Sequence, residues 1–360
     1  MPSLAGTLDA LRPLLPPALV SAAAFGRACS AVAHLQPQIT DGIYFECRLH
    51  DRSSRVDLVI IVRREGAALL SAPVSNATRG VRPEHPEWRR LGAFLRRWTA
   101  PGSSLHELIE HIWLEYDVEP PRPGSEASRP APGVFCRLRA PRRTAHSAHE
   151  LGRRMLTVVE ALAGRPVSRI VRNCLSLGVA LLPSEAAVPY VGLMIGRPVP
   201  TIRLCIAKLP AADAATYLAA TAAVGGHQVA DVTSQATLPD GAGGPWYVPL
   251  LHLDIDERRG FLPRVGLERP FPQFCQLAGK TGAREREFLE ALTAQGLCAR
   301  DKRDALLAWP GRSAAMLPHR LGWSVVERRI NHVKFVQDPD CLTEIKGYLF
   351  ARHYRRGERR

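Results

Sequence analysis

The sequence of 360 residues has few aromatic side chains, 6% of the total, and no long hydrophobic run. The apolar stretch Leu175–Pro183 is far shorter than the roughly 20 residues that a helix needs to cross a bilayer. The N-terminus also lacks a charged segment followed by a small-residue cleavage site. These absences argue against a membrane protein and a secreted one, and they predict a cytoplasmic location.

The eight cysteines form no C-x-x-C pair and stand at wide, irregular spacings. This pattern argues against a zinc ribbon and against a redox motif. It predicts buried free thiols in a reducing compartment.

The 48 basic and 34 acidic residues leave a net charge of +14, which favours an anionic partner. No zinc finger, RNP motif or basic zipper is present, so nucleic acid is not the expected partner. Paired arginines such as Arg89-Arg90 are typical of solvated helix faces. We expect a single domain over residues 1–360 that ends in a basic, frayed tail over residues 352–360.

A repeat of helix, strand and strand runs through the chain five times. Each strand pair is recognised by alternating apolar and polar residues, and each follows segments with helical spacing such as Pro86–Glu110 and Ser147–Leu162. The predicted strands are Gly42–His50, Arg55–Arg63, His111–Val118, Gly133–Arg139, Val188–Arg197, Thr201–Leu209, Tyr247–Glu257, Phe261–Arg269, Ile330–Gln337 and Leu342–Phe350.

Ten strands joined as consecutive hairpins form an antiparallel meander rather than a parallel sheet. Such a meander removes its unpaired edges by closing on itself. The predicted fold is therefore of the α+β class: a closed ten-stranded antiparallel β-barrel built from five αββ repeats and ringed by helices. An open sheet with a solvated polar face is the alternative, and the recurrence of the pattern in all five units favours the barrel.

In a barrel ringed by helices the outer strand face is apolar, so the other face lines the lumen. Buried charges without partners cost several kcal/mol each, so a charged lumen holds water or an anion. The expected lumen residues are Glu46, Arg48, Arg55, Asp57, Trp113, Glu115, Phe135, Arg137, Tyr190, Met194, Arg203, Cys205, His252, Asp254, Arg264, Glu268, His332, Lys334, Lys346 and Tyr348.

These residue types suit one kind of chemistry. Arginine and lysine bind diphosphate oxygens through charge-assisted hydrogen bonds. Aromatic faces stabilise a nearby carbocation. A carboxylate such as Glu46 can take the proton that an acceptor loses. Together these groups suit the ionisation of an allylic diphosphate and the alkylation of a nucleophile.

Three segments resemble the prenyltransferases of the αββα-barrel (PT-barrel) type. Ile43–Cys47 is similar to the first-strand segment in which the fungal indole and cyanobactin peptide enzymes carry their catalytic glutamate, which matches Glu46. Glu344–Leu349 resembles the Lys-x-Tyr strand signature that holds diphosphate, and Ile202–Ile206 resembles a third-repeat strand with a diphosphate-binding arginine. The length and the compact hairpins resemble the cyanobactin-type peptide enzymes most.

The resemblance implies a monomeric enzyme that moves a dimethylallyl or geranyl group from its diphosphate to a ribosomal peptide side chain or a small aromatic acceptor. It implies Glu46 as the catalytic base. With the lumen-facing cations added to the residues that the resemblance matches, the expected diphosphate-binding residues are Arg48, Arg137, Arg203, Arg264, Lys334, Lys346 and Tyr348. The expected cation shield and acceptor pocket comprise the lumen-facing residues Trp113, Phe135, Tyr190, Met194 and His252.

The fourth repeat departs from the family pattern. In Pro263–Glu268, Gly266 stands where a Lys-x-Tyr signature has tyrosine. Asp254 and Asp256 are an option for Mg²⁺ bound with the diphosphate, although acidic residues at a strand end are commonly part of a solvated hairpin.

Two other functions remain as alternatives. One is a non-catalytic barrel that binds a modified peptide. The other is an iron and 2-oxoglutarate oxygenase, because His252, Asp254 and a later His319 match a facial iron triad, with Arg329 for the co-substrate. A P-loop, a G-x-S-x-G elbow and a D-D-x-x-D run are all absent, which argues against the corresponding nucleotide, hydrolase and helical isoprenoid synthase classes.

Overall fold

The computed structural model describes residues 3–40, 42–50, 55–71, 85–118, 131–139, 148–197, 199–226, 247–271, 282–319 and 322–355. In this part of the chain each strand pair is preceded by helices, as the repeat predicts. The first two units contain α1 (Leu4–Leu11), η1 (Arg12–Leu14), α2 (Ala22–Val32), η2 (Pro37–Ile39), β1 (Gly42–Arg48), β2 (Val56–Val62), α3 (Arg64–Ser71), α4 (Pro86–Thr99), α5 (Ser104–Leu108), β3 (Ile109–Tyr116) and β4 (Gly133–Leu138).

The remaining three units repeat this order with longer strands at the end. They contain α6 (Ala148–Ala163), α7 (Arg169–Ala180), β5 (Ala187–Leu193), β6 (Ile202–Pro210), α8 (Ala211–Gly225), β7 (Tyr247–Asp256), β8 (Gly260–Pro270), α11 (Ala283–Ala294), α12 (Arg300–Ala308), β9 (Gly311–Met316), β10 (Trp323–Gln337) and β11 (Leu342–Arg355).

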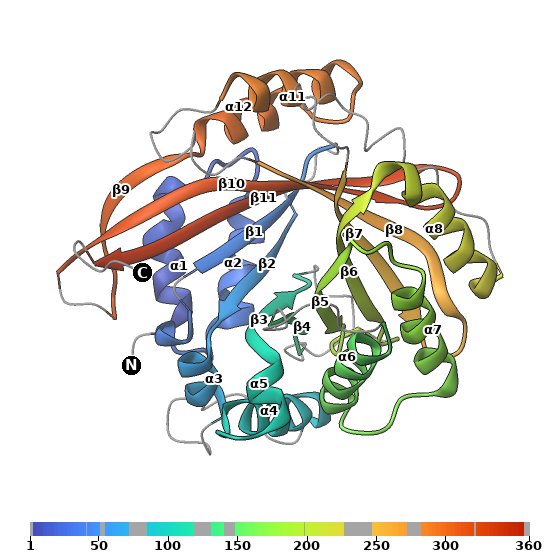
Figure 1. Cartoon of the computed structure of the whole chain (residues 1–360). Helices are drawn as coiled ribbons and strands as arrows, with labels where there is room; N and C mark the ends of the chain where they lie inside the picture. The colour runs from blue at the N-terminus through green and yellow to red at the C-terminus, as the bar shows by residue number, and fades with distance from the viewer. Residues whose placement is uncertain are drawn as a thin grey trace, which may run out of the picture.

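The strands close into a barrel because β11 pairs with β10 on one side and with β1 on the other. Ten of the described strands form this antiparallel ring, which confirms the predicted fold. β9 is an eleventh strand that pairs with β10 and lies outside the ring. Figure 1 shows the helices arranged around the ring, with α11 and α12 over the long strands β10 and β11.

The outer face of the barrel is apolar, as the alternation predicts. Ile43, Phe45 and Leu58 are fully buried in one core together with helix residues such as Trp98 and Leu175. Burial of apolar side chains on this scale is the main stabilising contribution to such a fold. The opposite strand face is thereby left to line the lumen.

Several elements differ from the sequence-based expectation, and α3 is one helix that was not predicted. α7 is a helix that was not predicted, although Ser168 caps it by accepting a hydrogen bond from the Val171 amide. β9 has no β-branched residue and was also not predicted. β10 begins at Trp323, seven positions before the predicted Ile330. The prediction missed the first part of this strand because a register shift between Ile330 and His332 interrupts the alternation of side chains there.

The predicted basic tail begins too early. β11 runs to Arg355, and Arg352 lies opposite Glu327 of β10 and Gly42 of β1. Pairing with β10 fixes residues 352–355 as strand, and residues 356–360 lie outside the described chain.

The described cysteines are free thiols, and five of them are buried: Cys47, Cys136, Cys174, Cys205 and Cys298. Cys29 is half-buried and Cys341 is exposed. Cys275 lies outside the described residues. Among the described helices, none is both long enough and apolar enough to span a membrane.

Candidate active site

The lumen contains a charged cavity toward the hairpin turns, which we call the polar cavity. It comprises about 500 Å³ of space between atoms, part of it open to solvent. Its lining consists of Glu46, Glu115, Arg197, Arg203, His252, Asp254, Arg264, Val265, Gly266, Lys334, Val336, Glu344, Lys346 and Tyr348.

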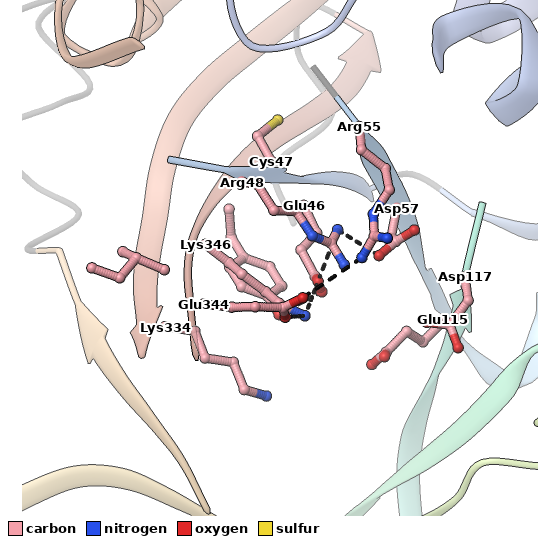
Figure 2. A network of polar contacts seen from close by, with 12 residues as sticks. Glu46, Cys47, Arg48, Arg55, Asp57, Glu115, Asp117, Lys334, Glu344 and Lys346 are labelled. Atoms are coloured by element: carbon pink, nitrogen blue, oxygen red, sulfur yellow. Dashed lines mark hydrogen bonds and ion pairs between the residues drawn. The ribbon is translucent and has the colours of Figure 1, made fainter. Parts of the chain in front are cut away.

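Glu46 of β1 is the centre of one ionic network in this cavity (Figure 2). The Lys346 Nζ lies 2.8 Å from its Oε1, and the Tyr348 hydroxyl donates a 2.5 Å hydrogen bond to its Oε2. Arg48 approaches to 3.4 Å. Burial raises the pKa of Glu46, but the charges of Lys346 and Arg48 outweigh it and hold the pKa well below its usual range. Glu46 is therefore a carboxylate at neutral pH.

Arg48 and Lys346 each have a second carboxylate partner. The Arg48 guanidinium lies 2.5 Å from Asp57 of β2, and Lys346 lies 2.9 Å from Glu344. The Lys302 ammonium of α12 donates a 2.7 Å hydrogen bond to the Arg48 carbonyl. The network therefore ties β1, β2 and β11 together, and an outer helix anchors the end of β1.

Two further arginines are held by paired hydrogen bonds. Arg203 of β6 donates to both oxygens of Asp254 on β7, at 2.6 and 2.9 Å. Arg197, after β5, donates to both oxygens of Asp117, at 2.9 and 3.3 Å. Such two-point pairs fix the guanidinium plane. Both arginines present their remaining surface to the polar cavity.

A second network surrounds Glu268 of β8. Its Oε1 lies 2.8 Å from His252 Nε2, 3.4 Å from His332 Nε2 and 3.7 Å from Lys334 Nζ. Burial, reinforced by the charge of Lys334, lowers the pKa of His252 to about 4. The pKa of Glu268 lies well below its usual range, because its cationic and histidine neighbours outweigh burial.

An aromatic cavity adjoins the polar one. Its rings are in mutual contact: Trp113 and Tyr190 have centroids 4.7 Å apart, and Tyr44 lies 5.8 Å from Trp113. The cavity is lined by Tyr44, Val59, Trp113, Glu115, Phe135, Tyr190, Cys205, Leu250, His252, Glu268, His332, Lys334 and Tyr348. The two cavities share Glu115, His252, Lys334 and Tyr348 in their linings, so they lie side by side.

The structure brings most of the predicted diphosphate residues together. The polar cavity is lined by Arg203, Arg264, Lys334, Lys346 and Tyr348. Arg48 lies behind Glu46 and is 5% exposed. Arg137 is placed elsewhere: its guanidinium lies 4.9 Å from the centre of the Tyr190 ring and 3.9 Å from Glu110, and it lines neither cavity.

Most of the residues predicted for the cation shield line one cavity. Trp113, Phe135, Tyr190 and His252 line the aromatic cavity. Met194 does not; it packs with Phe135 and Cys205, and its thioether lies over Gly133.

The surroundings of Gly266 explain why this strand has glycine where the Lys-x-Tyr pattern has tyrosine. A Cβ atom at this position would lie 2.8 Å from Lys334 Cε and 3.1 Å from His252 Cβ. Because glycine has no side chain, the Lys334 side chain can pass over Gly266 as it extends from β10 into the lumen.

The two aspartates of the Mg²⁺ option have partners within the protein. Both Asp254 oxygens bind Arg203, whereas one Asp256 oxygen accepts the amides of Arg258 and Arg259 in the β7–β8 turn. Both aspartates of the Mg²⁺ option are therefore engaged by groups of the protein itself. In the part of the chain that the structure describes, no group of three His, Cys, Asp or Glu side chains is arranged so that it could hold a metal ion.

The ligand set of the oxygenase alternative is wrong. His252 lies inside the lumen, whereas His319 follows β9 and contacts Thr7 of α1 at 3.1 Å and the ring of His353. The three proposed ligands therefore do not converge on one position.

Some cavity residues had no role in the sequence-based prediction. Glu115 was placed in the lumen without a function, while Tyr44, Arg197 and Glu344 were not among the expected lumen residues. Tyr44 and Glu344 share the strand faces of Glu46 and Lys346, so alternation alone could have found them. Arg197 lies in a turn, where no periodicity applies.

Comparison with known proteins identifies structures of similar architecture. A crystal structure of 5-dimethylallyltryptophan synthase from Streptomyces coelicolor is 14% identical, with 97% of each chain covered and a TM-score of 0.43. PriB, solved as a binary complex with product diphosphate, is 14% identical over 97% of this chain and 94% of that chain, with a TM-score of 0.49. AnaPT from Neosartorya fischeri is 14% identical over 87% and 77%, with a TM-score of 0.45.

No protein-family model matches the sequence, and no curated protein matches it. The barrel itself rests on the strand pairings of this chain.

Proposed function

We propose that the protein is a prenyltransferase that moves a short prenyl group from its diphosphate to an acceptor. The observation that carries the proposal is that a cation-lined cavity adjoins an aromatic one, with Lys334 and Tyr348 lining both. A prenyl diphosphate has the same two parts, a polyanionic head and an apolar tail that becomes cationic on ionisation.

The diphosphate is bound in the polar cavity by Arg203, Arg264, Lys334 and Lys346, with a hydrogen bond from Tyr348. Arg203 and Lys346 already have carboxylate partners, so the diphosphate competes with those partners for the cations. Oxyanion stabilisation of this kind favours the leaving group as charge develops on it.

The bond between the prenyl carbon and the diphosphate oxygen breaks, and its electron pair leaves with the diphosphate. The allylic cation is stabilised by the faces of Trp113, Phe135 and Tyr190 in the aromatic cavity. The acceptor then forms a bond to the prenyl carbon and loses a proton. Glu46 is the sequence-based candidate for taking that proton, and it becomes more basic when the diphosphate draws Lys346 away.

The donor is dimethylallyl or geranyl diphosphate, and the acceptor is a ribosomal peptide side chain or a small aromatic molecule. The enzyme acts as a cytoplasmic monomer. The aspartates considered for Mg²⁺ are engaged elsewhere, so no step is assigned to a metal.

A direct test incubates the protein with dimethylallyl and geranyl diphosphate and a panel of aromatic amino acids and peptides, followed by mass spectrometry. A prenyl adduct supports the proposal. Arg203→Gln is the matched variant, because it removes a cavity cation, and it is expected to lower turnover. No adduct with any donor, together with no calorimetric binding of inorganic diphosphate, would sink the proposal.

A non-catalytic barrel that binds a modified peptide is the second candidate. It is favoured by one observation: the lumen cations Lys346, Arg203 and Lys334 all have carboxylate partners within the chain. This candidate predicts peptide binding without any effect of inorganic diphosphate.

A further inference from the structure

Glu115 is a second lumen carboxylate that the reaction scheme above does not use. It lies on β3 and lines both the polar and the aromatic cavity. Its sheet neighbours are Val59 of β2 and Gly133 of β4, which offer it no polar side chain. Figure 2 shows its carboxylate directed into the open lumen, across from the network around Glu46.

The two carboxylates differ in how strongly they are engaged. Among the described residues, the ion-pair partner of Glu115 is Arg197 at 3.5 Å, and Arg197 directs both of its hydrogen bonds at Asp117. Glu46 instead receives Lys346 and Tyr348 at hydrogen-bond distance and Arg48 beside them. Glu115 therefore has free acceptor capacity where the two cavities meet, whereas that of Glu46 is largely occupied.

The charged surroundings of Glu115 include both signs. Burial and the nearby charges of Glu46 and Asp117 raise its pKa, and Arg203 and Arg197 lower it, with a net shift to about 7. Lys334 and Tyr348 also interact with it electrostatically from β10 and β11. A general base works best when its pKa lies near the working pH, because it is then both ionised and able to hold a proton.

We propose that Glu115, rather than Glu46, accepts the proton that the acceptor loses; this rests on the prenyl transfer proposed above. As the acceptor forms its bond to the prenyl carbon, the bond to its proton breaks. The electron pair of that bond stays with the acceptor, and the proton passes to a Glu115 oxygen. The carboxylic acid then returns the proton to water through the open side of the polar cavity.

Glu46 becomes a positioning residue in this scheme. It orients Lys346 and Tyr348 toward the diphosphate and compensates the charge of Arg48. Its removal is expected to weaken donor binding and turnover without changing which group titrates.

The test is the pH dependence of kcat/KM for the intact protein with the donor and acceptor found in the adduct assay. The wild type is expected to show an ascending limb near pH 7, as Glu115 ionises. Glu115→Gln is expected to lower kcat about 100-fold or more, which is the usual contribution of a general base, and to abolish that limb. Glu46→Gln is expected to lower activity and to keep the limb, displaced to lower pH because the charge of Glu46 raises the pKa of Glu115.

Two neighbouring variants move the limb in opposite directions. Arg197→Gln removes a cation that lowers the pKa of Glu115, so the limb is expected at higher pH. Asp117→Asn removes a like charge and releases Arg197 to Glu115, so the limb is expected at lower pH. Neither shift follows from a purely structural role for Glu115, and both can be measured even if Glu115→Gln does not fold.

The outcomes separate this inference from the proposed function. If the wild type forms no adduct and does not bind inorganic diphosphate, the prenyl transfer fails and the role of Glu115 falls with it. If the wild type is active but Glu115→Gln keeps its ascending limb, or the Arg197 and Asp117 variants leave the limb in place, only the assignment to Glu115 is overturned.

Discussion

Tyr348 of β11 donates a 2.5 Å hydrogen bond to Glu46 of β1, and the two residues stand directly opposite each other in the strand pair that closes the barrel. They are 302 positions apart in the sequence. This hydrogen bond helps to hold the fold together, because it joins the two strands that close the barrel. It is also part of the candidate site, because both side chains line the polar cavity. Stability and ligand binding are expected to respond together when it is changed.

Removing the Tyr348 hydroxyl tests how much its hydrogen bond stabilises the β1–β11 pair that closes the barrel. Tyr348→Phe keeps the ring that stacks on His332 but leaves Glu46 without one buried donor. We expect the free energy of unfolding to fall by about 1–3 kcal/mol, as for a lost hydrogen bond to a charged group. Urea denaturation measures it. The control is Tyr354→Phe, whose 3.4 Å bond to Glu327 is only partly buried. Equal effects of the two variants would contradict the special role of Tyr348.

The Arg203–Asp254 pair tests whether the polar cavity binds diphosphate. Asp254→Asn frees the guanidinium, so inorganic diphosphate is expected to bind about tenfold more tightly, equivalent to about 1.4 kcal/mol. Arg203→Gln is expected to weaken binding by a similar factor. Titration calorimetry measures both. Arg264→Gln is the control, because Arg264 is 47% exposed and a smaller change is expected. Unchanged affinity in both Asp254→Asn and Arg203→Gln would mean that the anion does not contact Arg203.

The buried His252 makes stability depend on pH. Its pKa is lowered from 6.5 to about 4 in the folded protein, so the unfolded chain binds the extra proton between these values. The contribution of the neutral His252 to the free energy of unfolding is present above pH 6.5 and is lost as the pH falls through 4. We expect a decrease of up to about 3 kcal/mol over this range. Denaturation at several pH values measures it.

The pH variant and its control separate His252 from the other titrating groups. His252→Gln is expected to flatten the pH dependence between 6.5 and 4, whereas substitution of the exposed His149 is expected to leave it intact. An unchanged slope in His252→Gln would show that the acid sensitivity arises elsewhere.

Gly192 of β5 tests the packing of the aromatic cavity. A Cβ atom there would lie 2.5 Å from the Phe135 ring and 2.7 Å from the Val134 carbonyl. Because backbone cannot easily move, Gly192→Ala is expected to destabilise the fold by about 1–3 kcal/mol. The control is Gly26→Ala in α2, where nothing lies within 4 Å; there alanine is expected to stabilise by about 1 kcal/mol. Thermal melting measures both changes in stability. An unchanged Tm for Gly192→Ala would contradict close packing of Phe135 and Val134 around this glycine.

Local alternation made the barrel predictable. In Gly42–His50 the side chains of Tyr44, Glu46 and Arg48 share one face, and the same pattern recurs through all five units. β9 was not predictable in this way, because Gly311–Met316 has little intrinsic strand preference and is held by its pairing with β10.

The sequence by itself determined the order of the elements, which strand face is apolar and which residue types line the lumen, because a period of two depends only on local backbone geometry. Only the tertiary structure decided how high along the barrel each lumen residue lies, since strands in a closed barrel are staggered relative to one another. This stagger separates Arg137 from Arg203 and places Glu115 where the two cavities meet. The residue types were therefore readable from the chain, whereas their grouping into one site was a property of closure.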